Sequence, residues 1–422
     1  MKGSKTQMSE KRIAYMSFIW NAIYAGFNAI QSSVILLAIA RNKELSEAGI
    51  ITIGFTVATL IMIIARYGIR NYQVTDAKEE YSFSDYFYVR IITVGGSLAL
   101  ALIYLFGMFA VGRYSPYKAL VVFEIIILKL VDAFEGLYVG RFQQKGRLDV
   151  GAKIATVRII LSTAVIFCLT WFVESVPVCF FAGIVVSVLT DVLLIPRGRE
   201  YADLSVRKEI GARIKPLLIT ALPLCIGTAL HNYIGNAPKY LVDFFLTDEI
   251  QAISGYIMMP MFVITVLNAF LMQPTVKSLG DAWHSGDKQK LKKMITRHVV
   301  LISAAAIGVL ILGIFVGLPL LSWMYKVDLV QYRPEFVLIM IGGTIYTISA
   351  YAIVLLTAMR RQKWIVIGCL VSVATYTLFG KLAVGSRGLA GAATIYIVSN
   401  VVLLMLFVFG MLSKQSRQII KE

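Results

Sequence analysis

Residues 299–324 read VVLISAAAIGVLILGIFVGLPLLSWM, a run of 26 residues without a charged side chain. An α-helix rises 1.5 Å per residue, so this run is long enough to cross the roughly 30 Å hydrocarbon core of a bilayer. A helix also keeps its backbone hydrogen bonds internal, which lets it lie in lipid without unpaired amides. The run therefore predicts a membrane-spanning helix.

Eleven further apolar stretches resemble this one. Together the stretches predict an all-α integral membrane protein with twelve transmembrane helices. The full set covers residues 14–38, 47–65, 87–111, 117–140, 154–173, 177–196, 216–246, 252–275, 299–324, 336–358, 364–380 and 388–412.

Lysine and arginine fall almost entirely into alternate gaps between these stretches. One set of gaps, which includes both termini, holds 30 of the 41 basic residues, and the other set holds 8. Basic loops stay in the cytoplasm, so both termini are expected there and the number of helices is even. The net charge of +17 is thus explained by topology and anionic lipid, and no nucleic acid is expected as a partner.

Composition and motifs argue against an enzyme. The chain is 58% hydrophobic and 15% charged, outside the range of soluble domains. Its four cysteines form no CxxC pair, and GxxxxGK[ST], HExxH and GxSxG are all missing. We therefore expect no catalytic residues, no cofactor and no metal site.

The polar gap at 197–215 separates six predicted helices from six. We expect an N-terminal bundle at 1–205 and a C-terminal bundle at 206–422, related as a parallel repeat because each begins in the cytoplasm. Asn21 in the first stretch and Asn232 in the seventh occupy similar places. Repeats of this kind usually enclose a central site between the halves.

Polar residues within the seventh stretch fall on one helical stripe. Asn232, Asn236, Lys239 and Asp243 are spaced by 4, 3 and 4 residues, and Lys239 and Asp243 could pair. Pro238 removes a backbone donor and could bend the helix. The stripe is either a lining for a polar cargo or a structural ion pair near the outer end of the helix.

Two further helices carry charges at membrane depth, where an ionised side chain needs a partner or a wet cavity. In the fourth stretch Lys129, Asp132 and Glu135 share an arc, and Lys129 could neutralise Asp132. They form either a proton or sodium relay or a packing network. Arg66 and Arg70 end the second stretch as candidate phosphate ligands, or as anchors that extend to the interface.

Three other charged residues suggest simpler roles. Arg90 is expected to anchor the third helix, and Arg158 is counted with the cytoplasmic gap at 141–153. Asp191 lies near the cytoplasmic end of its helix, close to Arg197.

Several short motifs resemble bacterial polysaccharide flippases of the Wzx type, in the exporter superfamily for multidrug, oligosaccharidyl-lipid and polysaccharide cargo. They are GIRNYQVTD at 68–76, EGLY at 135–138, QQKGRLD at 143–149, NAPKY at 236–240, and the Met-Pro and Gln-Pro pairs at 259–260 and 273–274.

The resemblance implies two six-helix bundles arranged as a V. It also implies a cargo, an oligosaccharide repeat unit linked by pyrophosphate to a polyprenyl lipid, for cell-surface polysaccharides such as O-antigen. The cargo would pass from the cytoplasmic to the outer leaflet of the bacterial inner membrane by alternating access. An ion gradient of protons or sodium would drive transport, and the polysaccharide polymerase machinery would be a further partner.

Under this interpretation the candidate residues divide into two groups. The cargo would contact Arg66, Arg70, Lys129, Asn232, Asn236 and Lys239. The coupling ion would act on Asp132, Glu135 and Asp243.

Two alternatives remain. A multidrug antiporter of the same superfamily would carry cations and favour a lining of carboxylates. A membrane polysaccharide polymerase or glycosyltransferase would need a substantial outer loop, and the outer gaps are short.

Overall fold

The computed structural model describes residues 2–76, 79–206, 213–272 and 275–413, and all regular structure in these ranges is helical. Ten helical segments are long and apolar enough to cross a membrane. One of them, Gln362–Leu412, contains two of the predicted stretches, and α5 carries a further stretch together with several ionisable residues. The prediction of a multi-pass, all-helical membrane protein is confirmed.

The chain forms two compact units, Met1–Ala229 and Leu230–Glu422. The helices of the first unit are α1 (Lys2–Asn42), α2 (Leu45–Arg66), α3 (Ile69–Thr75), α4 (Phe83–Ala110), α5 (Pro116–Gln144), α6 (Leu148–Phe172), α7 (Val176–Leu194) and the short η1 (Pro196–Glu200). The α8 helix (Ile214–Gly235) crosses the boundary between the units. A division into six-helix bundles at 205/206 stays a prediction.

The remaining elements belong to the second unit. They are α9 (Ala237–Phe245), α10 (Asp248–Met272), α11 (Val276–His284), α12 (Lys288–Leu312), the π-turn η3 (Gly313–Gly317), α13 (Leu318–Tyr325), η4 (Val330–Tyr332), α14 (Arg333–Ala358) and α15 (Gln362–Leu412). The opening stretch 299–324 is thus interrupted by a π-turn, and α15 contains a kink at Gly388, whose φ of 55° is non-helical.

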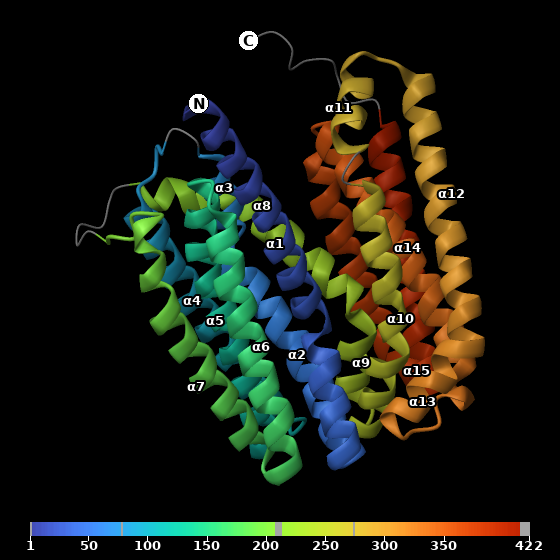
Figure 1. Ribbon diagram of the computed structural model, residues 1–422. Coiled ribbons are helices and arrows are strands. Elements are labelled where there is room, and N and C mark those ends of the chain that lie inside the picture. The colour runs from blue at the N-terminus through green and yellow to red at the C-terminus, as the bar shows by residue number, and fades with distance from the viewer. Residues whose placement is uncertain (1, 77–78, 207–212, 273–274, 414–422) are drawn as a thin grey trace. The chain divides into compact units, whose positions relative to one another are not determined.

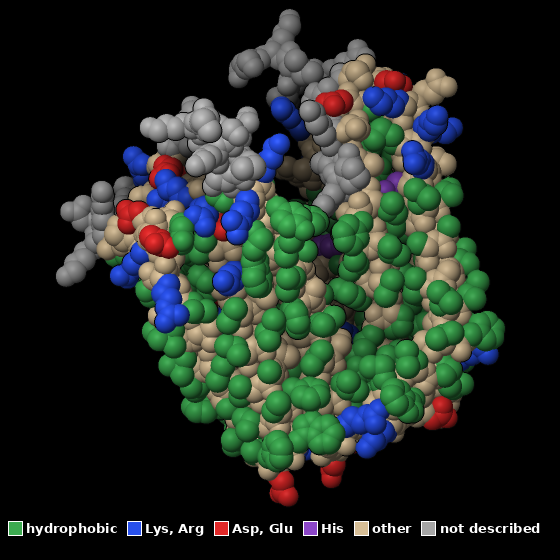
Figure 2. Space-filling model, in the orientation of Figure 1, with side chains coloured by type: hydrophobic (Ala, Val, Ile, Leu, Met, Phe, Trp, Pro, Cys, Tyr) green, Lys and Arg blue, Asp and Glu red, His purple; other side chains and the backbone are tan. Residues whose placement is uncertain are grey.

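Within unit 1, α1 packs along α6, α2 along α5, and α6 against α7 (Figure 1). Local signals fix several helix starts. The Ser82 side chain accepts from the Asp85 amide while Asp85 accepts from the Ser82 amide, which caps α4 at both groups. On the face shown in Figure 2, hydrophobic side chains cover the middle of the helices and charged side chains gather near their ends, as a bilayer requires.

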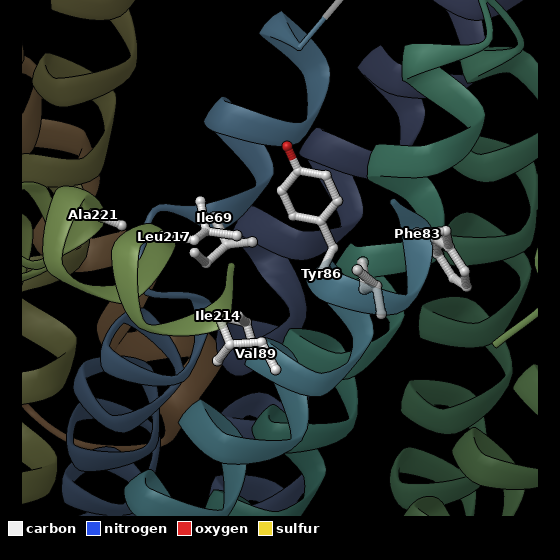
Figure 3. Close-up of a cluster of buried hydrophobic side chains, with 8 residues drawn as sticks. Ile69, Phe83, Tyr86, Val89, Ile214, Leu217 and Ala221 are labelled. Atoms are coloured by element: carbon white, nitrogen blue, oxygen red, sulfur yellow. The ribbon is translucent and has the colours of Figure 1, made fainter. Parts of the chain in front are cut away.

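A buried cluster joins α3, α4 and the start of α8 in unit 1 (Figure 3). Its buried members on these three elements include Ile69, Tyr86, Val89 and Leu217. The connection from α2 into α3 is a sharp turn, with φ of 52° at Tyr67 and 69° at Gly68. A Cβ on Gly68 would lie 2.7 Å from a Leu224 methyl carbon, so glycine serves both the backbone and the packing here.

Candidate functional site

The centre of unit 1 holds a buried network of charges around Arg158. Its guanidinium lies 2.7 Å from Asp132, donates to Glu135 at 2.8 Å and to the Ser187 hydroxyl at 2.7 Å, and lies 3.8 Å from Asp191. The Arg158 and Asp132 side chains are 0% exposed. The network therefore joins helices α5, α6 and α7 by ionic contacts within the membrane-spanning part of the bundle.

Lys129 extends this network toward α1. Its ammonium donates to Asp132 at 2.9 Å and to the Gln31 amide oxygen at 2.5 Å, and it lies 5.8 Å from the centre of the Phe55 ring. Gln31 in turn donates to Thr163 on α6 at 3.1 Å. The predicted pairing of Lys129 with Asp132 is confirmed, and the ammonium is held by two partners.

In direct contact, carboxylates outnumber cations in this network. Two cations, Lys129 and Arg158, face three carboxylates, on Asp132, Glu135 and Asp191. Arg66 and Arg70 also act electrostatically on Asp132 and Glu135 without an ion pair to either. Asp191 is its most accessible carboxylate, with a side chain 13% exposed.

Two expectations for charged residues in unit 1 were wrong. Arg158 does not belong to a cytoplasmic gap but lies inside α6, and Asp191 contacts it. Arg90 is not a surface anchor: it is 1% exposed and donates to the Ala65 carbonyl, which also accepts from Thr93 at 2.8 Å. These two side chains satisfy a carbonyl in the last turn of α2, where helical partners are missing.

The sequence contained evidence that Arg158 is buried, although Arg158 was assigned to a cytoplasmic gap. The residue interrupts the apolar run IATVRIILSTAVIF at 154–167, and the carboxylates at membrane depth outnumber the lysine beside them. An arginine inside such a run requires a buried acidic partner. Its closeness to a basic gap favoured the simpler interpretation.

Arg66 and Arg70 lie at one end of unit 1. Arg66 is the last residue of α2 and is partly exposed. Arg70 begins α3 and donates to Gln143 of α5 at 2.8 Å. Arg66 and Arg70 thus lie beside the helices that carry the network around Arg158, but neither forms one of its ion pairs.

The motifs at 68–76 and 143–149 meet at this end. Gln144 donates to the Asp76 carbonyl at 2.9 Å, and Lys145 pairs with Glu79 in the following loop. Arg141 also pairs with Glu79, at 3.3 Å. Lys145, and next Arg141, hold the pKa of Glu79 below its ordinary value. The two motifs therefore tie α3 and its loop to the end of α5.

In unit 2 the predicted seventh helix is broken. Asn236 has φ −107° and ψ 7° and separates α8 from α9, so its neighbours do not lie on one continuous helical stripe. The Lys239 ammonium lies 3.4 Å from the Asn236 amide oxygen, and the Asn236 amide donates to the Asn232 carbonyl at 3.2 Å. Asp243 is buried on α9. The expected bend at Pro238 is a full interruption, with proline in the first turn of the new helix.

Aromatic rings surround this break. Tyr233 and Tyr240 stack with ring centres 4.7 Å apart, and His231 stacks on Tyr346 at 4.4 Å. The Tyr396 hydroxyl donates to the carbonyl of Gly235, the last residue of α8, at 3.4 Å. Amides, an ammonium and stacked rings at one place are a chemistry suited to a polar, hydroxyl-rich ligand.

The Gln273-Pro274 pair lies outside the described residues. Among the residues that the structure does describe, no group of three or more His, Cys, Asp or Glu side chains is placed to hold a metal ion.

Comparison with known proteins gives matches in structure alone. No protein family model matches the chain, and no curated protein matches it. The lipid II flippase MurJ, in an inward closed conformation, matches with a TM-score of 0.69 at 12% identity, over 94% of this chain and 88% of that one.

Multidrug transporters match similarly. An inward-facing MATE-family transporter of the MOP superfamily gives a TM-score of 0.66 at 11% identity, over 93% of this chain and 97% of that one. The MATE multidrug transporter DinF-BH gives 0.60 at 15% identity, over 94% of each chain. This chain has the transporter fold of MurJ and the MATE proteins. At these identities the likeness establishes the fold and leaves the cargo open.

Proposed function

We propose that this protein is a flippase of the bacterial inner membrane that moves polyprenyl-pyrophosphate-linked oligosaccharide units from the cytoplasmic to the outer leaflet. The observation that carries the proposal is the buried network of unit 1, in which three carboxylates contact two cations, within a fold that transporters share. A proton or sodium ion that enters and leaves this network would couple transport to an ion gradient. Both termini would be cytoplasmic, as the distribution of basic residues favours.

The ion-coupling role belongs to Asp132, Glu135 and Asp191. Their carboxylates lie around Arg158, so a cation bound at one of them changes the charge that the arginine experiences from all three. Lys129 joins this group because its ammonium is already engaged by Asp132 and Gln31. Asp243 on α9 is a second candidate for coupling.

The cargo-binding role belongs to residues at two places. Arg66 and Arg70 carry permanent charge and planar donor groups that suit a pyrophosphate. Asn232, Asn236 and Lys239 offer amide and ammonium groups at the α8–α9 break, next to the stacked Tyr233 and Tyr240 rings. Amides suit sugar hydroxyls, and the ammonium suits a phosphate.

A reconstituted assay tests the proposal. Purified protein in liposomes would be given a fluorescent polyprenyl-pyrophosphate oligosaccharide, and its transfer between leaflets measured by access to a membrane-impermeant oxidant. We expect transfer above that of empty liposomes, faster with an imposed proton or sodium gradient. Lys239→Gln should slow transfer, whereas Lys381→Gln, at an exposed position on α15, should not.

The multidrug alternative is favoured by the MATE matches and by the three carboxylates. It predicts gradient-driven efflux of a lipophilic cationic dye from the same liposomes. Dye efflux without transfer of the glycolipid would refute the flippase proposal and establish the antiporter.

A further inference from the structure

A cavity of about 540 Å³ opens within unit 1 between α4, α5, α7 and η1. This volume is in the roughly 300–1,000 Å³ range of ligand pockets. Most of its wall is apolar, with Val94 and Leu98 from α4, Val131 and Phe134 from α5, and Val188 from α7. Asp191, one of the carboxylates proposed above for ion coupling, lines this cavity, whereas none of the residues proposed for cargo binding does.

The polar groups of the cavity gather toward one end. Along α5 the lining runs from Val131 and Phe134 to Tyr138, and along α7 it runs from Val188 to Asp191, with Arg199 following in η1. Short connections lead from α5 into α6 and from α6 into α7, and α6 packs against both, so α5 and α7 run in the same direction. The cavity is therefore amphipathic, as a site for an amphipathic ligand should be.

The surface beside the cavity faces lipid. On α7, Leu189, Val192 and Leu193 are 52%, 62% and 60% exposed, and Ile92 on α4 is 50% exposed. Exposed side chains of this kind on membrane-spanning helices contact acyl chains. A ligand with a long apolar chain can thus enter the cavity from the bilayer.

The charges at the polar end are of both signs. Arg199 is an exposed guanidinium, suited to hold two phosphate oxygens at once. Asp191 lines the cavity with a side chain 13% exposed, and its Oδ1 lies 3.8 Å from the Arg158 Nε. Asp191 is the acidic residue of the lining, so an ammonium would pair with it.

We propose that this cavity binds a zwitterionic membrane phospholipid, with one acyl chain among the apolar residues, its phosphate on Arg199 and its primary ammonium at Asp191. Charge complementarity selects this occupant. An anionic phospholipid without an ammonium would bring its phosphate near Asp191 without compensation, and a lipophilic cation would leave Arg199 without an anion. Phosphatidylethanolamine has both required groups.

Lipid retention on the purified full-length protein tests this site. The protein would be exchanged into mild detergent with equal amounts of phosphatidylethanolamine and phosphatidylglycerol, and bound lipid counted by native mass spectrometry. We expect preferential retention of phosphatidylethanolamine. Arg199→Gln should lower it roughly tenfold, the effect of about 1.4 kcal/mol in binding. Arg197→Gln, an exposed arginine of η1 that does not line the cavity, should retain it.

A second pair of variants tests the part of the cavity that would hold the acyl chain. Val131→Phe fills the apolar end and should abolish retention, whereas Val185→Phe, at an exposed position of α7 outside the cavity, should not. If Val131→Phe does not give a monodisperse protein, Leu98→Phe takes its place. Equal retention of the two lipids, or equal retention by Arg199→Gln and Arg197→Gln, would overturn the proposal. The readout requires no transport, so its failure would leave the flippase proposal standing.

Discussion

Replacing Arg158 with glutamine is the perturbation with the largest expected effect on stability. The guanidinium lies 2.7 Å from Asp132 and 2.8 Å from Glu135, and all three side chains are at most 1% exposed. Loss of one partner from a buried ion pair leaves an uncompensated charge and costs about 3–5 kcal/mol. In Arg158→Gln, Lys129 alone would face three carboxylates. We therefore expect the free energy of unfolding to fall by about this amount.

A double-mutant cycle separates this cause from simple loss of packing. Arg158→Gln combined with Glu135→Gln restores the native charge of the network. The double variant should therefore lose less free energy of unfolding than the two single variants lose together, by about 1–3 kcal/mol. Unfolding would be followed by tryptophan fluorescence in mixed micelles titrated with a denaturing detergent. Arg197→Gln, on the surface, should stay within about 0.5 kcal/mol of the unchanged protein. Additive losses in the double variant, or a loss in Arg158→Gln no larger than in Arg197→Gln, would refute the ionic explanation.

Three further predictions use the same unfolding measurement. The pKa of Glu79 is lowered chiefly by Lys145, so their contact stabilises the fold above the ordinary pKa of glutamate and is lost as the pH falls through the lowered value. Glu79→Gln should thus lose at most about 1 kcal/mol at pH 7, because the pair is exposed and screened by solvent. Its difference from the unchanged protein should disappear as the pH falls through the lowered pKa, and a pH-independent difference would contradict this. Gly68→Val places a branched side chain at φ 69° against Leu224 and should cost at least about 1–2 kcal/mol, and a neutral result would mean that the turn relaxes. Asp287→Ala removes the side chain that accepts from the amide of the third residue of α12 and should cost about 0.5–2 kcal/mol, whereas Asp287→Asn should keep most of the cap.

The helices were predictable because a bilayer requires long apolar runs, and these are visible without tertiary information. Where the structure describes them, the twelve stretches are mainly helical, but interruptions within them were harder to anticipate. Pro238 signalled the α8–α9 break, whereas the π-turn at 313–317 has only two glycines to mark it. The kink at Gly388 needs a positive φ, which a sequence of small residues permits but does not specify.

The pairing of side chains across helices was less predictable. Helical spacing correctly joined Lys129 to Asp132, because both lie on α5 three residues apart. It could not join either residue to Arg158 on α6, since the relative rotation of two helices depends on packing over their whole length. The same holds for Arg90, whose partner is a backbone carbonyl of another helix and has no sequence signature.

The location of Arg158 also constrains where a phosphorylated cargo can bind. Because Arg158 lies inside the bundle, the cytoplasmic gaps hold one basic residue fewer than the sequence count gave them, and the inferred orientation is unchanged. In the interior, Arg158 is one of two cations, with Lys129, that contact three carboxylates. Under the proposed function, a pyrophosphate brought to this network would meet three carboxylates, and the Lys129 ammonium is already engaged by Asp132 and Gln31. We therefore propose that phosphate recognition belongs to Arg66, Arg70 and Lys239, and that the network serves the coupling ion.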